Sequence, residues 1–257
     1  MAFIFPKNDR EIFPKTFLKD ISVSFDFNKV REERIRNHSL TTFFSSKFKI
    51  TELDLGQYAS GLEVQSQDEQ VKFIFALDHV CLKMKFPAYR SFDFALQWLN
   101  YMLDYLRSLE VYEITSLIIG KYNQLQYVIP QERSKDISVG TVMKEIFSSA
   151  LLKYDFGDET SFEKESEKFN SLARWEKRII INDDEYPNLR FIIEYGFRES
   201  DDRRGKCELT LKTLINNESN ISISEIELTM NKLNEIIDDG FRWCVGDNII
   251  EQMRNKE

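Results

Sequence analysis

Few residues in this chain have types and spacings that could carry out catalysis. A nucleophilic Ser or Cys needs a base beside it, and the only histidines are His38 and His79. His79 follows Asp78 and precedes Cys81, an order that would fit an oriented base beside a thiol. The alternative, which we favour, is that Asp78 and His79 form a turn while Cys81 faces the core. We therefore predict no catalytic residue.

Clustered carboxylates could bind a divalent metal for phosphodiester cleavage, and the sequence has three acidic clusters, at 183–185, 201–202 and 238–239. Each cluster is expected in a turn or on an exposed helix face, where its charges are solvated. No Glu is followed two residues later by Lys, which removes the Glu-x-Lys part of many nuclease motifs. The 9 glycines form no phosphate-binding loop. We predict no metal and no cofactor, with a metal-dependent phosphodiester-cleaving enzyme as one alternative function.

A second alternative is a nucleic-acid-binding module that uses a local basic hairpin. The basic residues of this hairpin are Arg198, Arg203, Arg204 and Lys206. Acidic residues at 199 and 201–202 dilute their charge, and the whole chain carries a formal charge of −8, which repels a phosphate backbone. A charged hairpin tip is the simpler interpretation. Arg198, Arg203 and Arg204 remain candidate binding residues.

A stretch rich in strand-forming residues, 110–131, lies near the middle of the chain and contains a polar insertion. Lys121, Tyr122 and Asn123 follow Gly120 and the apolar residues 117–119, so the predicted strand passes from buried to polar at the glycine. One interpretation is a strand end with a bulge and an exposed turn. The other is that Lys121, Tyr122 and Asn123 form a recognition site, where another chain approaches.

Period-two alternation and apolar runs predict the strands of both halves. In the first half the strands lie at 17–27, 47–53, 61–67, 70–77 and 80–86, after an extended arm at 1–16 and with a short helix and loop at 28–48. Ser91 then has the position of an N-cap for a helix with apolar residues at spacings of three and four. In the second half the strands lie at 171–181, 189–198 and 206–215, and a helix follows from Ser224.

These elements predict an α+β protein of two antiparallel meander-plus-helix units, with the helices packed on the sheet. The first half is 1–154, an acidic linker or exposed crossover occupies 155–168, and the second half is 169–257. Residues 142–154 are expected to form a short helix that runs into a strand. The repeated order favours an internal duplication of architecture, and two such units can pair their sheets edge to edge or pack their helices together.

The composition is typical of a folded, soluble protein. Hydrophobic residues make up 42% and charged residues 30% of the 257 residues. Cys81, Cys207 and Cys244 are far apart, odd in number and without a CxxC pair, so we expect reduced core cysteines. No apolar run has the length of a membrane span or of a signal peptide. A cytoplasmic location without membrane contact is therefore expected.

The sequence Gly120-Lys121-Tyr122-Asn123, followed by an apolar residue and Pro130, resembles the middle of an uncharacterised, sporadically distributed bacterial protein family. The stretch 13–27 is similar to the first strand of that family, and 233–249 is similar to its closing helix. The family usually has Arg before the Tyr and one residue between Tyr and Asn. The resemblance implies an accessory or mobile-element role, such as defence against phage, and it supplies no catalytic residues.

We predict from these observations a non-enzymatic interaction protein. Its partner would be another protein or a second copy of the chain, and it would serve as an accessory of a bacterial defence or mobile-element system. Two observations favour this function. The sequence has no catalytic motif, and its aromatic content is high, so that some of the aromatic residues could lie at an interface.

Overall fold

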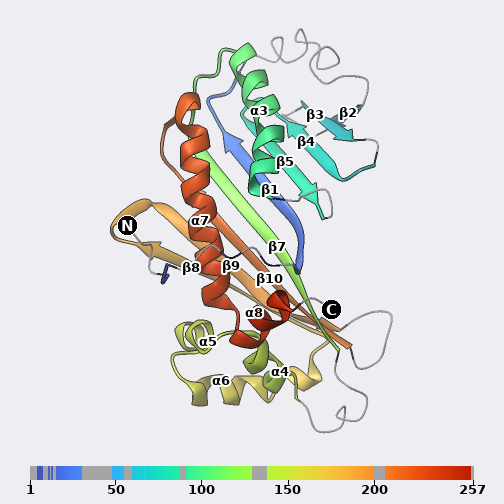
Figure 1. Ribbon diagram of the computed structural model, residues 1–257, viewed down its shortest axis with the longest axis vertical. Coiled ribbons are helices and arrows are strands. Elements are labelled where there is room, and N and C mark those ends of the chain that lie inside the picture. Colours follow the sequence, from blue (N-terminus) through green and yellow to red (C-terminus); the bar gives the residue numbers. More distant parts are fainter. Residues whose placement is uncertain are drawn as a thin grey trace.

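The fold is a large antiparallel sheet with helices packed on it (Figure 1). The computed structural model describes residues 5–7, 11, 13, 16–30, 48–54, 60–66, 68–86, 91–128, 138–199 and 206–255. The predicted α+β class is confirmed. The short helix predicted within 28–48 lies almost wholly outside the described residues, as do Arg203 and Arg204.

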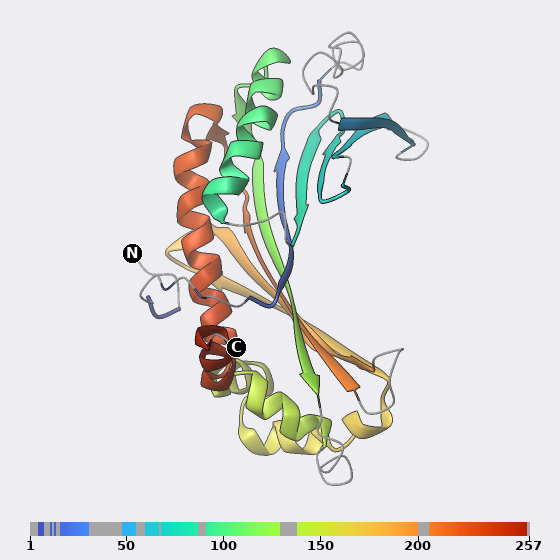
Figure 2. The same cartoon turned by 45° about the vertical axis from the view of Figure 1, so that its right-hand side comes forward.

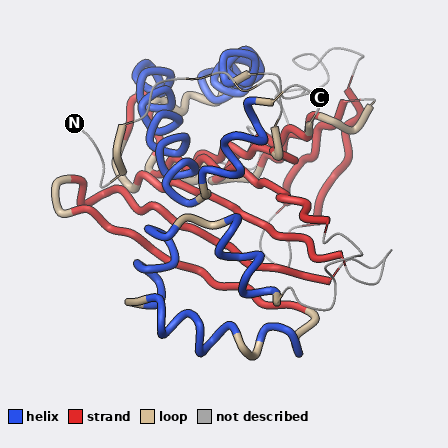
Figure 3. Tube along the Cα trace, turned by 60° about the horizontal axis from the view of Figure 1, so that its bottom comes forward, coloured by secondary structure: helices blue, strands red, loops and turns tan. Residues whose placement is uncertain are grey.

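Nine strands form the sheet, and every pair of neighbours is antiparallel. Across the sheet the order is β2 (Phe48–Asp54), β3 (Ser60–Ser66), β4 (Val71–Phe75), β5 (His79–Lys85), β1 (Leu18–Asp26), β7 (Ser116–Val128), β10 (Lys206–Asn217), β9 (Tyr186–Glu199) and β8 (Arg174–Asp183). Figure 3 shows these strands side by side through the molecule, with helices in two groups beside them. The strands predicted at 17–27, 47–53, 61–67, 70–77, 80–86, 171–181, 189–198 and 206–215 are all present, as is a strand within 110–131.

Helix α3 (Phe92–Ser108) covers the first half of the sheet. It begins where the sequence predicts, because Ser91 Oγ accepts a hydrogen bond from the backbone N–H of Phe94 at 3.2 Å. Its buried stripe packs on strands whose alternation points every second side chain toward it, as Ile21, Val23 and Phe25 do in β1. Amphipathic periodicity in the sequence is enough to position this layer.

Strands β7 and β10 join the two halves. They pair over twelve residues, from Lys206 opposite Val128 to Asn217 opposite Leu117, so the halves share one continuous sheet. Both halves do place a meander before a helix, but the first contributes six strands and the second three. The structure shows edge-to-edge pairing and does not confirm an internal duplication.

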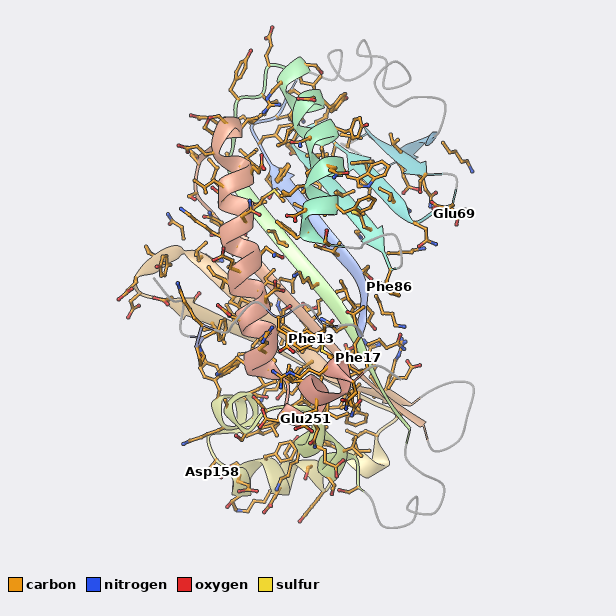
Figure 4. All side chains as sticks on the ribbon, viewed as in Figure 1. Phe13, Phe17, Glu69, Phe86, Asp158 and Glu251 are labelled. Atoms are coloured by element: carbon orange, nitrogen blue, oxygen red, sulfur yellow. The ribbon has the colours of Figure 1, made fainter. Side chains whose placement is uncertain are left out.

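The connection from β7 to β8 differs from the prediction because it contains no strand in its described part. It forms the helices α4 (Val139–Ile146), α5 (Ser149–Phe156) and α6 (Glu159–Ser166) and a short 3-10 turn, η2 (Phe169–Ser171). Ser148 caps α5 by accepting from Leu151 N at 3.1 Å, and Gly157 ends it with a φ of 84°. Asp158, labelled in Figure 4, then caps α6. Local capping thus makes the acidic segment 155–168 mostly helical.

Helix α7 (Ile226–Cys244) is the longest helix in the described part of the chain and crosses the second half of the sheet. As predicted, it runs through the step at 238–240 without a break. Gly240 allows it to approach β9, because a Cβ there would lie 2.2 Å from Phe191 Cζ. A 3-10 turn, η3 (Ile223–Glu225), leads into it, and α8 (Asp247–Arg254) follows it. A two-stranded sheet, β6 (Glu113–Ile114) with β11 (Ile221–Ser222), lies outside the main sheet.

The described residues of the N-terminal arm lie against α7 and α8. Phe5 is buried, with its ring centroid 4.7 Å from that of Phe191 and 5.3 Å from that of Trp243. The guanidinium of Arg242 lies 4.8 Å from the Phe13 ring, which Figure 4 shows beside the C-terminal half of α7. Glu11 forms an ion pair with Arg254 at 2.8 Å. These contacts attach the arm to the helical layer.

The described helices pack on one face of the nine-stranded sheet (Figure 2). We call the opposite face of this sheet the open face. Burial follows this division, since Leu117 and Ile119 of β7 are buried on the helical side while Ile118 on the open face is half-buried. No helix in the described part of the chain is long and apolar enough to cross a membrane.

Candidate functional site

The polar insertion does not end its strand. β7 continues through Gly120 to Val128, and its pairing with β10 stays in register across the insertion. The only irregularity beside it lies in the pairing with β1, between Leu18 and Asp20. The interpretation as a strand end with an exposed turn is therefore wrong, because a neighbouring strand on each side satisfies the backbone of the polar residues.

Alternation along β7 separates the three candidate residues. Lys121 and Asn123 point to the helical side, where their exposed fractions are 8% and 5%, while Tyr122 points to the open face. Burial is the largest cause that raises the pKa of Tyr122 above its usual range, and Glu208 and Asp20 add to it against the lowering effect of Arg198. A recognition site made of all three residues is not supported, whereas Tyr122 remains available to one.

The Lys121 side chain connects β7 to α7. Its Nζ donates to Asp238 Oδ1 at 2.5 Å, and Asn234 Nδ2 donates to the other carboxylate oxygen at 3.3 Å. The side chain of Lys121 is 10% exposed and that of Asp238 is 54% exposed, so the pair lies at the border of the core. The ion pair holds α7 against β7, because the Asp238 carboxylate at the helix surface compensates the charge of the buried Lys121 ammonium.

Strand register aligns the side chains of the open face in rows across the sheet, and we call the part of one row that lies between β5 and β8 the open-face row. Strand register places opposite one another, in order, Lys83 of β5, Ser22 of β1, Gly120 of β7, Leu214 of β10, Ile192 of β9 and Ile180 of β8. The row therefore has a cation at one end, two small residues in the middle and three aliphatic residues at the other end. Ile180 is 49% exposed.

The small residues in the middle fit closely. A Cβ on Gly120 would lie 2.9 Å from Ser22 Oγ and 3.4 Å from Leu214 Cδ2, so this position has little room for a side chain. At about 4.8 Å between strands, the row spans about 24 Å from Lys83 to Ile180. Gly120 is itself buried between these two side chains, so the centre of the span is low and closely packed.

Ion pairs occupy the open face on one side of the row in the second half of the sheet. Lys212 lies 3.0 Å from Glu194, and Arg198 lies 2.8 Å from Glu208. Arg198 is one of the predicted binding residues, and its charge is compensated by this partner on the neighbouring strand. The described part of the predicted basic hairpin is therefore not an accumulation of positive charge.

The opposite corner of the open face is different. Lys83 and Lys85 are both exposed, and within the described part of the chain neither has an ion pair. Lys72 stands directly opposite Lys83, but it is paired with Glu63 at 2.9 Å. The nearest described acid in β1, Asp20, has its pKa raised first by burial, against the lowering effect of the surrounding lysines. This corner is cationic in a chain of negative net charge.

His79 does lie beside Cys81, but the carboxylate that orients it is not Asp78. His79 Nδ1 lies 2.6 Å from Asp26 Oδ1, because register places Asp26 of β1 opposite His79 of β5. Cys81 follows two residues later on the same face and is 5% exposed. The alternation in β1 places Asp26 on the polar face of its strand, but no local pattern in the sequence indicates that β1 pairs with β5 and brings Asp26 to His79.

A groove of about 700 Å³ lies where the turn between β8 and β9 and the end of β10 meet α7. It is lined by aliphatic side chains such as Leu233 and Ile236 and by Lys7, Lys232 and the buried Asn217. This volume falls in the range of small-ligand sites. None of the described residues that line it is His or Cys, so it presents no nucleophile with an imidazole base.

The acidic clusters do not converge in the described residues. Among these residues no three His, Cys, Asp or Glu side chains are placed to hold a metal ion. Asp238 binds Lys121, and Asp183 accepts from the backbone N–H of Glu185 at 2.9 Å in the turn after β8. The cluster at 201–202 lies outside the described residues. Cys81 and Cys244 are free and buried. Cys244 belongs to the core, as predicted, whereas Cys81 lies on the open face opposite Ser24 and does not face the core.

A scan against protein-family models finds no match for the chain, and a search of curated proteins finds none either. The resemblance to the sporadically distributed bacterial family therefore stays a prediction.

Proposed function

We propose that this chain works by binding another protein and that the open-face row is the docking surface. The observation that carries this proposal is the row itself, an aliphatic end and a cationic end joined by two small residues on a sheet face that no described helix covers. Exposed apolar surface bordered by polar residues is typical of protein interfaces. Docking requires no cofactor and no catalytic group.

The charges of the open face indicate the chemistry of the partner. A protein segment with carboxylates at one end would be attracted to Lys83 and Lys85, while its aliphatic side chains would pack on Leu214, Ile192 and Ile180. A span of about 24 Å corresponds to about seven residues of extended chain. Glu194 and Glu208 neutralise the cations Lys212 and Arg198 on the same face, which leaves less positive charge for a phosphate backbone. Among the described Phe, Tyr and Trp residues of β7, Tyr122 is the one on this face that could stack on a base.

The biological role that we propose follows from the family resemblance. An accessory of a bacterial defence or mobile-element system, such as phage defence, would use this surface to attach to a protein component of that system. No observation on the described carboxylates favours the phosphodiester-cleaving alternative. Of the candidate binding residues of the basic hairpin, Arg203 and Arg204 lie outside the described residues, and Arg198 is already paired with Glu208.

The test uses a synthetic peptide of ten residues, with Glu and Asp in one half and Val, Ile and Leu in the other, and fluorescence anisotropy. Lys83→Glu and Ile180→Glu change the two ends of the row, and each should weaken binding by about tenfold or more. The matched controls are Lys153→Glu in α5 and Leu228→Glu in α7, which make the same changes at exposed positions on the helical side and should leave affinity unchanged.

Three outcomes would overturn the proposal. The first is that the wild-type chain does not bind the peptide, or that the controls weaken binding as much as the row variants. The second is that a single-stranded oligouridine binds more tightly and loses affinity in the same row variants, which would show a nucleic-acid surface. The third is a dimer in sedimentation that Lys83→Glu and Ile180→Glu dissociate, which would assign the row to a second copy of the chain.

A further inference from the structure

The groove beside α7 is built from four segments that lie far apart in the sequence. Lys7 comes from the N-terminal arm, Tyr186 and Leu189 from the start of β9, Asn217 from the end of β10, and Leu233 from α7. The groove therefore exists only in the folded chain, and its lining combines apolar and polar side chains.

One part of this lining is apolar. Leu233 is 2% exposed, while Tyr186, Leu189 and Ile236 are half-buried and pack against the core. The groove has a volume of about 700 Å³, which is in the range of sites for organic ligands and far larger than an inorganic ion needs. A ligand that fills it would carry an aromatic or aliphatic body.

The Asn217 side chain offers a hydrogen-bond donor at the groove. It lies on the helical side of β10 and is 9% exposed. Its Oδ1 accepts a hydrogen bond from Ser219 Oγ at 2.6 Å. Its Nδ2 has no acceptor within the described part of the chain, so it is available to donate to an oxygen atom of a ligand.

Two lysines add positive charge at the same groove. Lys7 of the arm and Lys232 of α7 are exposed, and neither forms an ion pair in the part of the chain that the structure describes. The position of Lys7 is set by Phe5, which is buried against Trp243 two residues earlier in the chain. Two ammonium groups and an amide donor are suited to hold one anionic group.

Two acids, Glu185 and Glu235, also line the groove, and both are exposed. Glu185 lies in the turn between β8 and β9, where its backbone N–H binds Asp183. At about 100° per residue around α7, Lys232 lies about 40° from Ile236, whereas Glu235 lies about 100° from it. The lysine is therefore closer to the apolar lining than the acid is, and the two acids favour a ligand with a single negative charge.

We infer that this groove binds a small organic monoanion, a carboxylate with an aromatic or aliphatic body. The carboxylate accepts a hydrogen bond from Asn217 Nδ2 and lies near the ammonium groups of Lys7 and Lys232. The body packs on Leu189 and Ile236. The site belongs to the helical side of the sheet, so it is separate from the open-face row.

The experiment uses isothermal titration calorimetry of the folded full-length chain with two probes of the same shape. We expect 2-naphthoate to bind with a dissociation constant below about 1 mM. The neutral 2-naphthamide has the same aromatic body without the charge, and it should bind at least about fivefold more weakly.

Variants of the groove locate the binding. Lys7→Glu and Lys232→Glu should each weaken the binding of 2-naphthoate by about fivefold and change that of 2-naphthamide by less than about twofold. Asn217→Asp keeps the acceptor for Ser219 but replaces the amide donor by a second carboxylate, so it should weaken 2-naphthoate by about tenfold. Lys164→Glu in α6 is the matched control at an exposed position outside the groove and should have no effect. Circular dichroism checks that each variant is folded.

Three results would overturn the inference. The first is that 2-naphthoate shows no saturable binding at millimolar concentration. The second is that the two probes bind equally well, or that the three groove variants bind 2-naphthoate no more weakly than Lys164→Glu does. The third is that inorganic phosphate at an equal concentration displaces 2-naphthoate, which would show that charge alone is recognised. The docking function is tested separately, because Lys83→Glu and Ile180→Glu should leave 2-naphthoate binding unchanged.

Discussion

The ammonium of Lys121 lies 2.5 Å from the carboxylate of Asp238, and this contact joins the centre of β7 to the surface of α7. Replacing Asp238 by Ala leaves the cation of a side chain that is 10% exposed without this carboxylate. We expect the free energy of unfolding to fall by about 1–2 kcal/mol, because the pair is partly screened by solvent. Urea denaturation measures this change.

Lys121→Met is the companion variant. An apolar side chain of similar length removes the buried charge and its partner requirement together, so the expected change is within about 1 kcal/mol and in either direction. A larger loss in Lys121→Met than in Asp238→Ala would contradict this account and would mean that the ammonium makes a more important contact beneath the helix.

Gly240→Ala should destabilise the fold even though Ala favours helix. The new Cβ would lie 2.2 Å from Phe191 Cζ, inside the packed interface of α7 and β9. Overpacking costs about 1–3 kcal/mol, which exceeds the gain of about 1 kcal/mol in helix propensity. Adding Phe191→Leu makes room for the methyl group, so the double variant should lose less stability than the sum of the two single changes. Thermal unfolding measures these changes in stability. If the loss in the double variant equals the sum of the losses in the two single variants, the contact between residues 240 and 191 is not the cause.

The carboxylate of Asp155 is buried between Lys177, whose Nζ lies 2.6 Å away, and the hydroxyl of Tyr195, which donates to it. Burial, followed by this hydrogen bond, raises the pKa of Tyr195 far above its usual range. Tyr195→Phe should cost about 1–2 kcal/mol, and Asp155→Ala about 2–3 kcal/mol because two partners lose their acceptor. Tyr154→Phe, at a half-exposed position of α5, is the control with no expected effect. Chemical denaturation measures these losses. If Tyr195→Phe loses more stability than Asp155→Ala, Asp155 does not serve as the shared acceptor of Lys177 and Tyr195.

The stability should depend on pH through His79. Its pKa in the folded chain is about 9, above the ordinary histidine value of 6.5, so the imidazolium contributes stability that is fully present below pH 6.5 and is lost as the pH rises through 9. Because the side chain is 36% exposed, we expect a contribution of about 1 kcal/mol after screening. Melting temperatures at about pH 6 and pH 9.5 test this. The decrease between them should be smaller in His79→Gln, and an equal decrease would contradict the prediction.

Local patterns predicted the elements well where one face of each is buried. Ser91 predicted the start of α3, and the alternation of apolar and polar residues predicted β1. The apolar spacing from Ile226 to Cys244 predicted that α7 continues through Gly240. The connection after β7 was predicted less well. Its short helices depend on caps such as Ser148 and Asp158, and a run of apolar residues there reads equally well as a strand.

The sequence by itself determined the fold class, the order of strands and helices, and the residues that alternate between two faces. Only the tertiary structure decided which strands are neighbours, because hydrogen bonds between distant strands leave no local signal. That choice brings Asp26 to His79, sets Lys83 and Ile180 at the ends of one row, and buries Lys121 beneath Asp238. The polar insertion around Gly120 therefore became the middle of a sheet, where burial on one side and an open face on the other give its residues different roles.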